Sequence, residues 1–411
     1  MKIIQVHNYY KQTGGEDVVV KAELELLQSK GNTVVTYYKN NEDICGLVSK
    51  VQTAFKTLWN HAVYKEFVKL LQDERPDVVH CHNAFPLISP SIYWACSKEN
   101  IPIVQTIHNY RLLCLNALLL LKDKSDKYNI CERCVKKSFK FPGIINRCYK
   151  NSFFGSLVLA KMLYIHKLIG TWNNKIDKYV VLTDFQKEKF IKAGLPNEKI
   201  TVKPHFIKVL EAEKSFDDNY GDYAVYVGRL SKEKGCDIAI KAWKLLKEKS
   251  DSDLIKLLIV GDGEEKENLE KLADNLGIQS SVLFLGKQPY TKVLSLLQNS
   301  KCLIMPSICY ESFGLTIIEA FSCGCPVIAS DSGNTASIID NNQNGLLFSM
   351  GNHQDLYTKL NTLLTNNELS KRISTNAKKS FEQKYCEDTN YEQLIKIYDS
   401  AIESKKNGKS Y

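Results

Sequence analysis

The chain has 411 residues, of which 44% are hydrophobic and 25% are charged. This is an ordinary globular composition, and the length predicts two domains of about 200 residues, each able to bury its own core. The formal net charge of +9 is uneven, because residues 1–205 carry 30 Lys and Arg against 18 Asp and Glu.

No targeting or membrane segment is predicted. The first residues hold only a short apolar stretch interrupted by Gln5, which is too short for the core of a secretory signal. No apolar run approaches the ~20 residues that a membrane span needs. The 13 cysteines then favour reduced thiols over a disulfide framework. We therefore expect a cytoplasmic protein.

In the first half of the chain, short apolar runs alternate with amphipathic segments. The predicted strands are Lys2–His7, Thr33–Tyr38, Asp77–His80, Ile103–His108 and Lys178–Thr183. The predicted helices are Glu16–Lys30, Lys65–Glu74, Ser156–Trp172 and Asp184–Ala193.

The second half repeats this rhythm. The predicted strands are Ala224–Val227, Leu254–Val260, Val282–Leu285, Cys302–Met305 and Val327–Ala329. The predicted helices are Cys236–Lys249, Glu264–Leu276, Tyr290–Asn299 and Gly314–Phe321, and a mostly helical remainder follows.

Strands that alternate with helices at this spacing predict an α/β protein with two Rossmann-like, doubly wound parallel sheets. We expect an N-terminal domain over 1–205 with an irregular cysteine-bearing insert near 112–150, and an acidic linker over 206–222. A second domain is expected over 223–385, followed by a helix over 386–411 that packs back on the first domain. Ligands of such sheets bind at the carboxyl ends of the strands, so functional residues should follow strands directly.

Two glycine-containing loops meet this condition. Gly14 and Gly15 follow the first strand and precede a helix, where a bare backbone and free N–H groups suit a phosphate. Arg229 and Lys234 follow the strand Ala224–Val227 and could hold an anion, Arg by a forked contact and Lys as a point charge. A structural turn and a pair of surface cations remain the alternative interpretations.

A pair of carboxylates marks the third candidate. Glu311 precedes the helix expected from Gly314, and Glu319 lies inside it. The backbone amides of Gly314, Leu315 and Thr316 would then lie between two acids at a helix N-terminus. This arrangement suits an extended ligand that carries hydroxyls at both ends and phosphate in the middle.

His108 is the fourth candidate, at the end of the strand Ile103–His108. A single histidine is more often structural than catalytic. Its position at the carboxyl end of a strand, followed by Asn109, favours a place beside a bound ligand.

Taken together and in this order, these motifs resemble the retaining GT-B glycosyltransferases of family four, over essentially the whole chain. The stretches Gly261-Asp262-Gly263, Phe284-Leu285-Gly286 and Gly324-Cys325-Pro326-Val327 add to the resemblance. It implies transfer of a sugar from a UDP- or GDP-linked donor with retention of configuration and without a catalytic metal. A nucleotide-sugar epimerase or another GT-B enzyme is the alternative.

The resemblance also implies a role for each candidate residue. Glu311 would bind the transferred sugar and His108 would line the reaction centre. The remaining donor contacts would come from Gly14, Gly15, Arg229, Lys234, Gly314, Leu315, Thr316 and, at the ribose, Glu319.

Four cysteines fall in the expected insert: Cys114, Cys131, Cys134 and Cys148. The spacing of Cys131 and Cys134 is that of a zinc knuckle, and the other two could complete a structural zinc site. Reduced thiols without metal are an equally open interpretation, as is other metal or redox chemistry.

The region from Arg133 to Lys178 carries ten basic residues and the single acid Asp177. A solvated basic face, an anionic membrane surface and a phosphate-bearing acceptor all fit this pattern. The helix Ser156–Trp172 within it reads first as core-packing and otherwise as interfacial. We expect a lipid-linked saccharide acceptor, as in O-antigen, capsule or exopolysaccharide assembly, with peripheral contact at the inner face of the cytoplasmic membrane. Nucleic acid is not expected as a partner.

Overall fold

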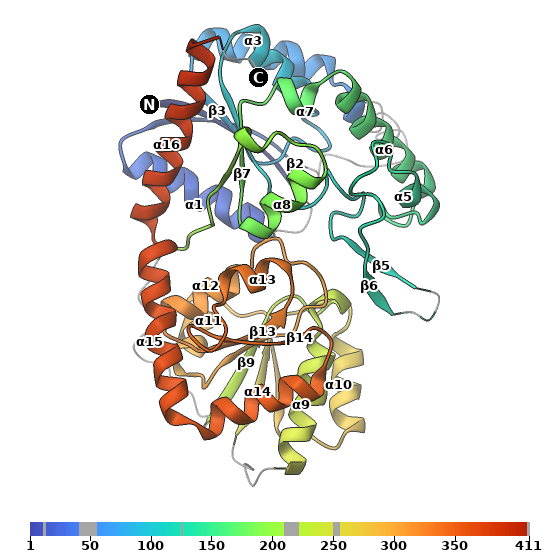
Figure 1. Cartoon of the computed structure of the whole chain (residues 1–411), viewed down its shortest axis with the longest axis vertical. Helices are drawn as coiled ribbons and strands as arrows, with labels where there is room; N and C mark the ends of the chain where they lie inside the picture. The colour runs from blue at the N-terminus through green and yellow to red at the C-terminus, as the bar shows by residue number, and fades with distance from the viewer. Residues whose placement is uncertain are drawn as a thin grey trace. The chain divides into compact units, whose positions relative to one another are not determined.

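A computed structural model describes residues 1–10, 14–40, 56–123, 125, 127–208, 222–249 and 255–408. It contains two six-stranded sheets, and the strand pairs in both are parallel. The chain divides into two compact units (Figure 1). The N-terminal unit comprises Met1–Leu121, Cys131–His205 and Glu387–Tyr411, and the C-terminal unit comprises Phe206–Cys386 with Lys122–Ile130. The predicted α/β class with two doubly wound sheets is confirmed.

The sheet of the N-terminal unit has the strand order β2-β1-β3-β4-β7-β8. Its strands are β1 (Lys2–Tyr9), β2 (Thr33–Asn40), β3 (Val78–Cys81), β4 (Ile103–Thr106), β7 (Lys178–Val181) and β8 (Ile200–Val202). Its helices are α1 (Gly15–Ser29), α3 (His61–Glu74), α4 (Ser91–Lys98), α5 (Phe141–Ile145), α6 (Phe153–Leu168), α7 (Thr171–Asn174), α8 (Asp184–Lys192) and the 3₁₀ turn η2 (Asn197–Lys199).

The sheet of the C-terminal unit has the order β11-β10-β9-β12-β13-β14. Its strands are β9 (Tyr223–Val227), β10 (Lys256–Val260), β11 (Val282–Gly286), β12 (Leu303–Met305), β13 (Val327–Asp331) and β14 (Leu346–Ser349). Its helices are η3 (Lys232–Lys234), α9 (Cys236–Lys249), α10 (Lys266–Asn275), α11 (Tyr290–Asn299), α12 (Leu315–Ser322), α13 (Gly333–Ile338), α14 (His353–Thr365) and α15 (Asn367–Lys384).

Burial explains why the strands were readable from the sequence. All four residues of β3 and of β4 are buried, as expected of parallel strands covered on both faces. The core of the C-terminal unit surrounds Trp243 of α9, which is fully buried. In the two large sheets the edge strands β8 and β14 were not predicted, because both are short and only partly buried, so that no continuous apolar run marks them.

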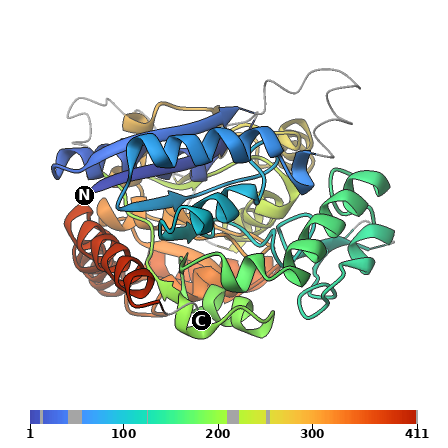
Figure 2. The ribbon, with the colours of Figure 1, turned by 90° about the horizontal axis from the view of Figure 1, so that it is seen from above.

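The last helix, α16 (Glu387–Lys406), packs on the N-terminal unit. Leu394, Ile397, Tyr398 and Ala401 join a buried cluster with residues of β1, β3, β4 and β7. In Figures 1 and 2 this red helix lies at the opposite side of the unit from α5 and α6. The predicted linker falls mostly outside the described residues, since only 206–208 and Asp222 of it are described.

The predicted helix Ser156–Trp172 is shorter at its C-terminal end than expected. The helix α6 starts at Phe153 and ends at Leu168, and Gly170, at φ +72°, separates it from α7. Glycine adopts this left-handed conformation without a Cβ clash. The insert is also less irregular than expected, because β5 (Leu120–Lys122) and β6 (Tyr128–Ile130) form a two-stranded ribbon and α5 follows.

Glycines allow two loops at the carboxyl edge of the C-terminal sheet to touch. Gly261 follows β10 with φ +138°, and a Cβ on it would lie 1.8 Å from the carbonyl oxygen of Gly228. Contact of backbone with backbone leaves no flexible side chain that could move aside. Gly277 also has a positive φ, of +67°, but faces open space.

We therefore expect Gly261→Ala to lower the free energy of unfolding by roughly 3 kcal/mol or more, since a clash with backbone adds to the conformational strain. Gly277→Ala is the matched control, with a cost of about 1–2 kcal/mol from its positive φ alone. Urea denaturation of both variants provides the comparison. Equal losses would show that the Gly228–Gly261 contact does not constrain the fold.

Candidate active site

The strand order places two candidate loops side by side in the C-terminal unit. β9 and β12 are neighbours, and the chain leaves them toward opposite edges of the sheet, β10 and β11 on one side and β13 and β14 on the other. Such a switch point is where open α/β sheets bind ligands, outside the carboxyl ends of the strands. The loop with Lys234 follows β9 and the loop with Glu311 follows β12.

Lys234 and Glu311 form an ion pair across this switch point. The Lys234 Nζ lies 2.8 Å from each carboxylate oxygen of Glu311. The Ser307 hydroxyl donates to Glu311 Oε1 at 2.5 Å. Burial lowers the pKa of Lys234, but the Glu311 carboxylate outweighs this effect and raises the pKa above its ordinary value. Lys234 is therefore a fixed cation, and its side chain is 28% exposed.

Arg229 lies in the same loop but contacts a different carboxylate. Its guanidinium Nη2 donates to Glu233 Oε1 at 2.6 Å, and the Ser231 hydroxyl donates to the same oxygen at 2.7 Å. The Arg229 side chain is 55% exposed. The guanidinium end of this pair is exposed, which leaves its other N–H groups accessible to a ligand anion.

The helix α12 begins where the sequence predicts a phosphate site. Gly314 is its N-cap residue, at φ +108°, a conformation open to glycine but strained for other residues. The first N–H groups of a helix, here those of Leu315 and Thr316, have no acceptor within the helix. The Asn334 side chain donates to the backbone carbonyl oxygens of Glu311 and Ser312 and so fixes the approach to the helix.

Glu319 lies on α12, within its last turns. Burial raises the pKa of its carboxyl to about 7. Glu319 also contributes, after burial itself, to the raised pKa of the Tyr290 phenol at the start of α11. The two side chains are therefore near neighbours, a relation that the sequence does not reveal.

The parallel sheet of the N-terminal unit also has a switch point. It lies between β1 and β3, where the order in which strands are added to the sheet changes side. Gly14 and Gly15 follow β1, and a Cβ on Gly14 would meet nothing within 4 Å. Asp17 caps the helix, since its Oδ2 accepts from the Gly14 amide at 2.9 Å, while Oδ1 lies 2.8 Å from His7 Nε2. The Glu16 carboxyl has its pKa raised to about 8 by burial and then by Asp17.

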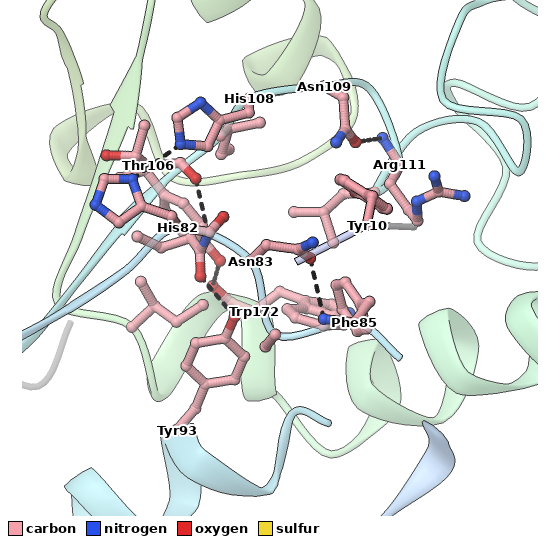
Figure 3. A pocket seen from close by; sticks show the side chains of 16 residues that line it. Tyr10, His82, Asn83, Phe85, Tyr93, Thr106, His108, Asn109, Arg111 and Trp172 are labelled. Atoms are coloured by element: carbon pink, nitrogen blue, oxygen red, sulfur yellow. Dashed lines mark hydrogen bonds between the residues drawn. The ribbon is translucent and has the colours of Figure 1, made fainter. Parts of the chain in front are cut away.

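His108 lines a pocket at the carboxyl ends of β1, β3 and β4. Figure 3 shows it beside His82, whose Nδ1 lies 2.9 Å from His108 Nε2. Burial and neighbouring histidines lower the pKa of His108 well below its ordinary value, so the imidazole is neutral. Its Nδ1 has no hydrogen-bond partner among the described residues. The labelled lining residues are Tyr10, His82, Asn83, Phe85, Tyr93, Thr106, His108, Asn109, Arg111 and Trp172.

Behind this pocket lies a buried charge network. Glu23 Oε1 is 2.9 Å from His80 Nδ1 and 3.1 Å from His82 Nε2, and Glu23 Oε2 is 3.5 Å from the Lys203 ammonium. Burial opposes ionisation of Glu23, but both imidazoles and Lys203 outweigh it and hold the pKa of Glu23 below its usual range. The ligand atoms of Glu23, His80 and His82 could converge on a metal, but Lys203 already balances the carboxylate.

The predicted candidates thus fall into two groups. Arg229, Lys234, Glu311, Glu319 and the α12 N-terminus lie in the C-terminal unit, and Gly14, Gly15 and His108 lie in the N-terminal unit. Sequence reasoning missed several polar neighbours: His82, Glu16, Ser307, Tyr290 and Asn334. For His82 a signal was present, since it directly follows β3, just as His108 follows β4 after one residue.

Comparison with known proteins agrees with this division. The family model described as glycosyl transferases group 1 matches residues 210–380, and the model described as glycosyltransferase family 4 matches residues 13–209. Poly(ribitol-phosphate) α-N-acetylglucosaminyltransferase of Staphylococcus aureus is 24% identical over 91% of this chain and 75% of its own length. N-acetyl-α-D-glucosaminyl L-malate synthase of Bacillus anthracis is 26% identical over 85% of this chain and 81% of its own.

Among solved structures, HepE of Anabaena in complex with UDP and glucose superposes with a TM-score of 0.68. It is 17% identical over 97% of this chain and 100% of its own, a likeness that shows the fold. Two Rossmann-like parallel sheets, matched by these two family models in tandem, define the GT-B glycosyltransferase fold. The chain therefore belongs to the group 1 glycosyltransferases of family four.

Proposed function

We propose that this enzyme transfers a sugar from a nucleoside diphosphate donor to a phosphate-bearing glycan acceptor, with retention of anomeric configuration. The observation that carries the proposal is the Lys234–Glu311 pair at the switch point of the C-terminal sheet, next to the N-terminus of α12. A fixed cation, a helix N-terminus and two carboxylates match the phosphates and hydroxyls of such a donor.

In this proposal the diphosphate lies over Gly314, Leu315 and Thr316, where helix N–H groups and the helix dipole favour negative charge. Lys234, and Arg229 from its exposed position, neutralise the charge that grows on the leaving diphosphate as the glycosidic bond breaks. Glu311 accepts hydrogen bonds from hydroxyls of the transferred sugar. Glu319 accepts from the ribose hydroxyls.

The N-terminal unit is proposed to contact the transferred sugar and the acceptor. The neutral imidazole of His108 would lie beside the sugar. Gly14 and Gly15 leave open space beside the N-terminus of α1, where a phosphate or sugar could approach the backbone closely. A donor phosphate oxygen would help to deprotonate the acceptor hydroxyl on the same face, so that configuration is retained. No catalytic metal is invoked.

The names of two relatives support an anionic acceptor. One acts on poly(ribitol-phosphate) and the other forms a sugar-malate conjugate, and both acceptors carry negative charge. Both names also specify an α linkage, the configuration expected when an α-linked donor reacts with retention. The positive excess of residues 1–205 would attract such an acceptor, including a polyprenyl-diphosphate-linked saccharide.

Exposed apolar side chains on α6 support contact with a membrane surface. Phe154, Ile165 and Leu168 are 77%, 40% and 67% exposed. Along the chain, Phe154, Lys161, Ile165 and Leu168 are separated by seven, four and three residues. This spacing places them along one face of the helix. The opposite face, with Leu159 and Leu163, is buried.

Two further exposed apolar residues, Phe141 and Ile145, lie on the neighbouring helix α5, at 58% and 60% exposure. Apolar side chains among many basic ones are the pattern of a helix that lies on an anionic bilayer. Among the described helices none is both long and apolar enough to cross a bilayer.

We expect Glu311→Ala and Glu311→Gln to lower kcat/KM by about 10²–10³-fold, because each removes the negative charge of the carboxylate that contacts the reacting sugar. The assay is nucleotide release over a panel of UDP- and GDP-sugars with polyprenyl-linked acceptors. Glu382→Gln, an exposed change on α15, is the control. Full transfer by the Glu311 variants would contradict the site, and conversion of the donor sugar into its epimer without any acceptor would instead indicate an epimerase.

The raised pKa of Glu319, about 7, predicts a pH-dependent donor affinity. The ionised carboxylate is the better hydrogen-bond acceptor, and its fraction rises from about one tenth at pH 6 to about nine tenths at pH 8. The donor KM should therefore fall roughly tenfold over this range while kcat changes less. Glu319→Gln cannot ionise and should flatten this profile. Identical profiles for wild type and variant would remove Glu319 from the ribose site.

For the membrane face, Phe154→Ser with Leu168→Ser should reduce binding to phosphatidylglycerol vesicles at least tenfold, because each buried side chain contributes about 1.5–3 kcal/mol. Flotation of the purified protein with these vesicles gives the readout. Val18→Ser, a 58% exposed apolar residue on α1, should bind like the wild type. Equal binding by the wild type, the double variant and Val18→Ser would contradict a membrane face that is both basic and apolar. Binding of the wild type only to vesicles of phosphatidylcholine would also contradict it.

A further inference from the structure

We propose that Cys114, Cys131, Cys134 and Cys148 bind one structural zinc ion that fastens the insert of the N-terminal unit. Each of the four carries a free thiol, and none belongs to the donor-binding residues. The three turns of the chain that carry these cysteines meet, backbone amides surround the sulfurs, and a buried lysine lies beside them.

Three chain turns that carry the cysteines pack against one another. The Cys131 amide donates to the carbonyl oxygen of Leu119 at 2.8 Å, which joins the second turn to the loop that follows Cys114. A Cβ on Gly143 would lie 2.8 Å from Leu115 Cδ1 and 3.5 Å from the Cys134 sulfur. The Cys148 amide donates to the carbonyl oxygen of the same Gly143 at 2.9 Å. Gly143 is thus the point where all three turns meet.

The four sulfurs also lie within electrostatic range of one another. The Cys148 sulfur interacts with those of Cys114, Cys134 and Cys131, and the Cys134 sulfur interacts with those of Cys114 and Cys131. The three turns thus bring all four thiols into one small region of the insert.

Backbone amides hydrogen-bond to two of the sulfurs. The N–H groups of Asn116, Ala117 and Leu119 contact the Cys114 sulfur, and the Gly143 amide contacts the Cys134 sulfur. Amides that surround a sulfur form the outer shell that orients and stabilises a metal-bound thiolate.

A buried lysine supplies the second, independent observation. Lys140 is 5% exposed, and its ammonium donates to the backbone carbonyl oxygens of Cys134 and Lys137 at 2.8 and 2.9 Å. The Cys134 and Cys114 sulfurs lie within electrostatic range of this ammonium. Four thiolates around a divalent ion leave a net charge of −2, which Lys140 would partly neutralise.

The spacing of the sulfurs indicates what binding would change. Among the described residues, one group of three or more potential metal ligands has all its ligand atoms within 4.8 Å of one another, namely Glu23, His80 and His82. No three of the four sulfurs meet this limit, so they are more widely spaced. Zinc–sulfur bonds of about 2.3 Å in a tetrahedron would draw them together. Cys131 and Cys148 are half-buried, and their side chains would have to turn toward the ion. A tetrahedral set of four sulfurs selects zinc or an iron–sulfur centre.

Zinc would also order the residues between the last two cysteines. Cys134 and Cys148 enclose α5, with its exposed Phe141 and Ile145. A five-residue helix has little stability of its own. A metal clamp at both ends of this stretch would therefore hold the segment in place.

The test is the metal content of the full-length protein, purified under reducing conditions and measured by inductively coupled plasma mass spectrometry. We expect about one zinc per chain in the wild type and a loss of at least tenfold in Cys131→Ser and Cys134→Ser. Cys386→Ser is the matched control, because Cys386 is also half-buried but lies outside the insert, and it should keep its zinc.

A second measurement covers the case in which the serine variants fold poorly. The metal-free, reduced wild type should bind one cobalt(II) ion and develop the thiolate charge-transfer and tetrahedral ligand-field bands of a four-sulfur site. Equal zinc in all variants, cobalt spectra without sulfur ligation, iron–sulfur absorption in the isolated protein or a Cys131–Cys134 disulfide would each overturn the proposal.

Discussion

The ion pair between Lys234 and Glu311 is the interaction on which the candidate donor site depends. It joins the loops that follow β9 and β12 with 2.8 Å contacts to both carboxylate oxygens. These loops meet only because the two strands are neighbours at the point where the sheet reverses its winding order. The pair holds a cation at the edge of the sheet, next to the N-terminus of α12. The position of this cation therefore follows from the strand order.

The N-terminal unit has a different electrostatic character. Burial lowers the pKa values of His82 and His205 to about 3 and that of His108 well below its ordinary value. These imidazoles stay uncharged and can exchange hydrogen bonds with hydroxyl groups. The buried ion pair of Glu23 with Lys203 lies beside them, since Glu23 also contacts His82. The candidate site of the C-terminal unit thus presents charged groups, and that of the N-terminal unit presents neutral imidazoles.

The insert between β4 and β7 is where this enzyme departs from a plain parallel sheet. It carries the cysteines, a buried lysine and apolar side chains that remain exposed on α5 and α6. In our proposal these features serve acceptor recognition and contact with an anionic membrane surface.

The sequence by itself determined the fold class, most element boundaries and the candidate residues at the ends of strands. Long periodic segments such as Cys236–Lys249 and Tyr290–Asn299 were predicted to the residue, because amphipathic spacing over three turns has one interpretation. Tertiary structure decided the partners. That Glu311 pairs with Lys234 while Arg229 pairs with Glu233, and that His82 and Glu23 stand behind His108, depends on contacts between distant segments. Periodicity records only which face of an element is buried, and not which side chains meet there.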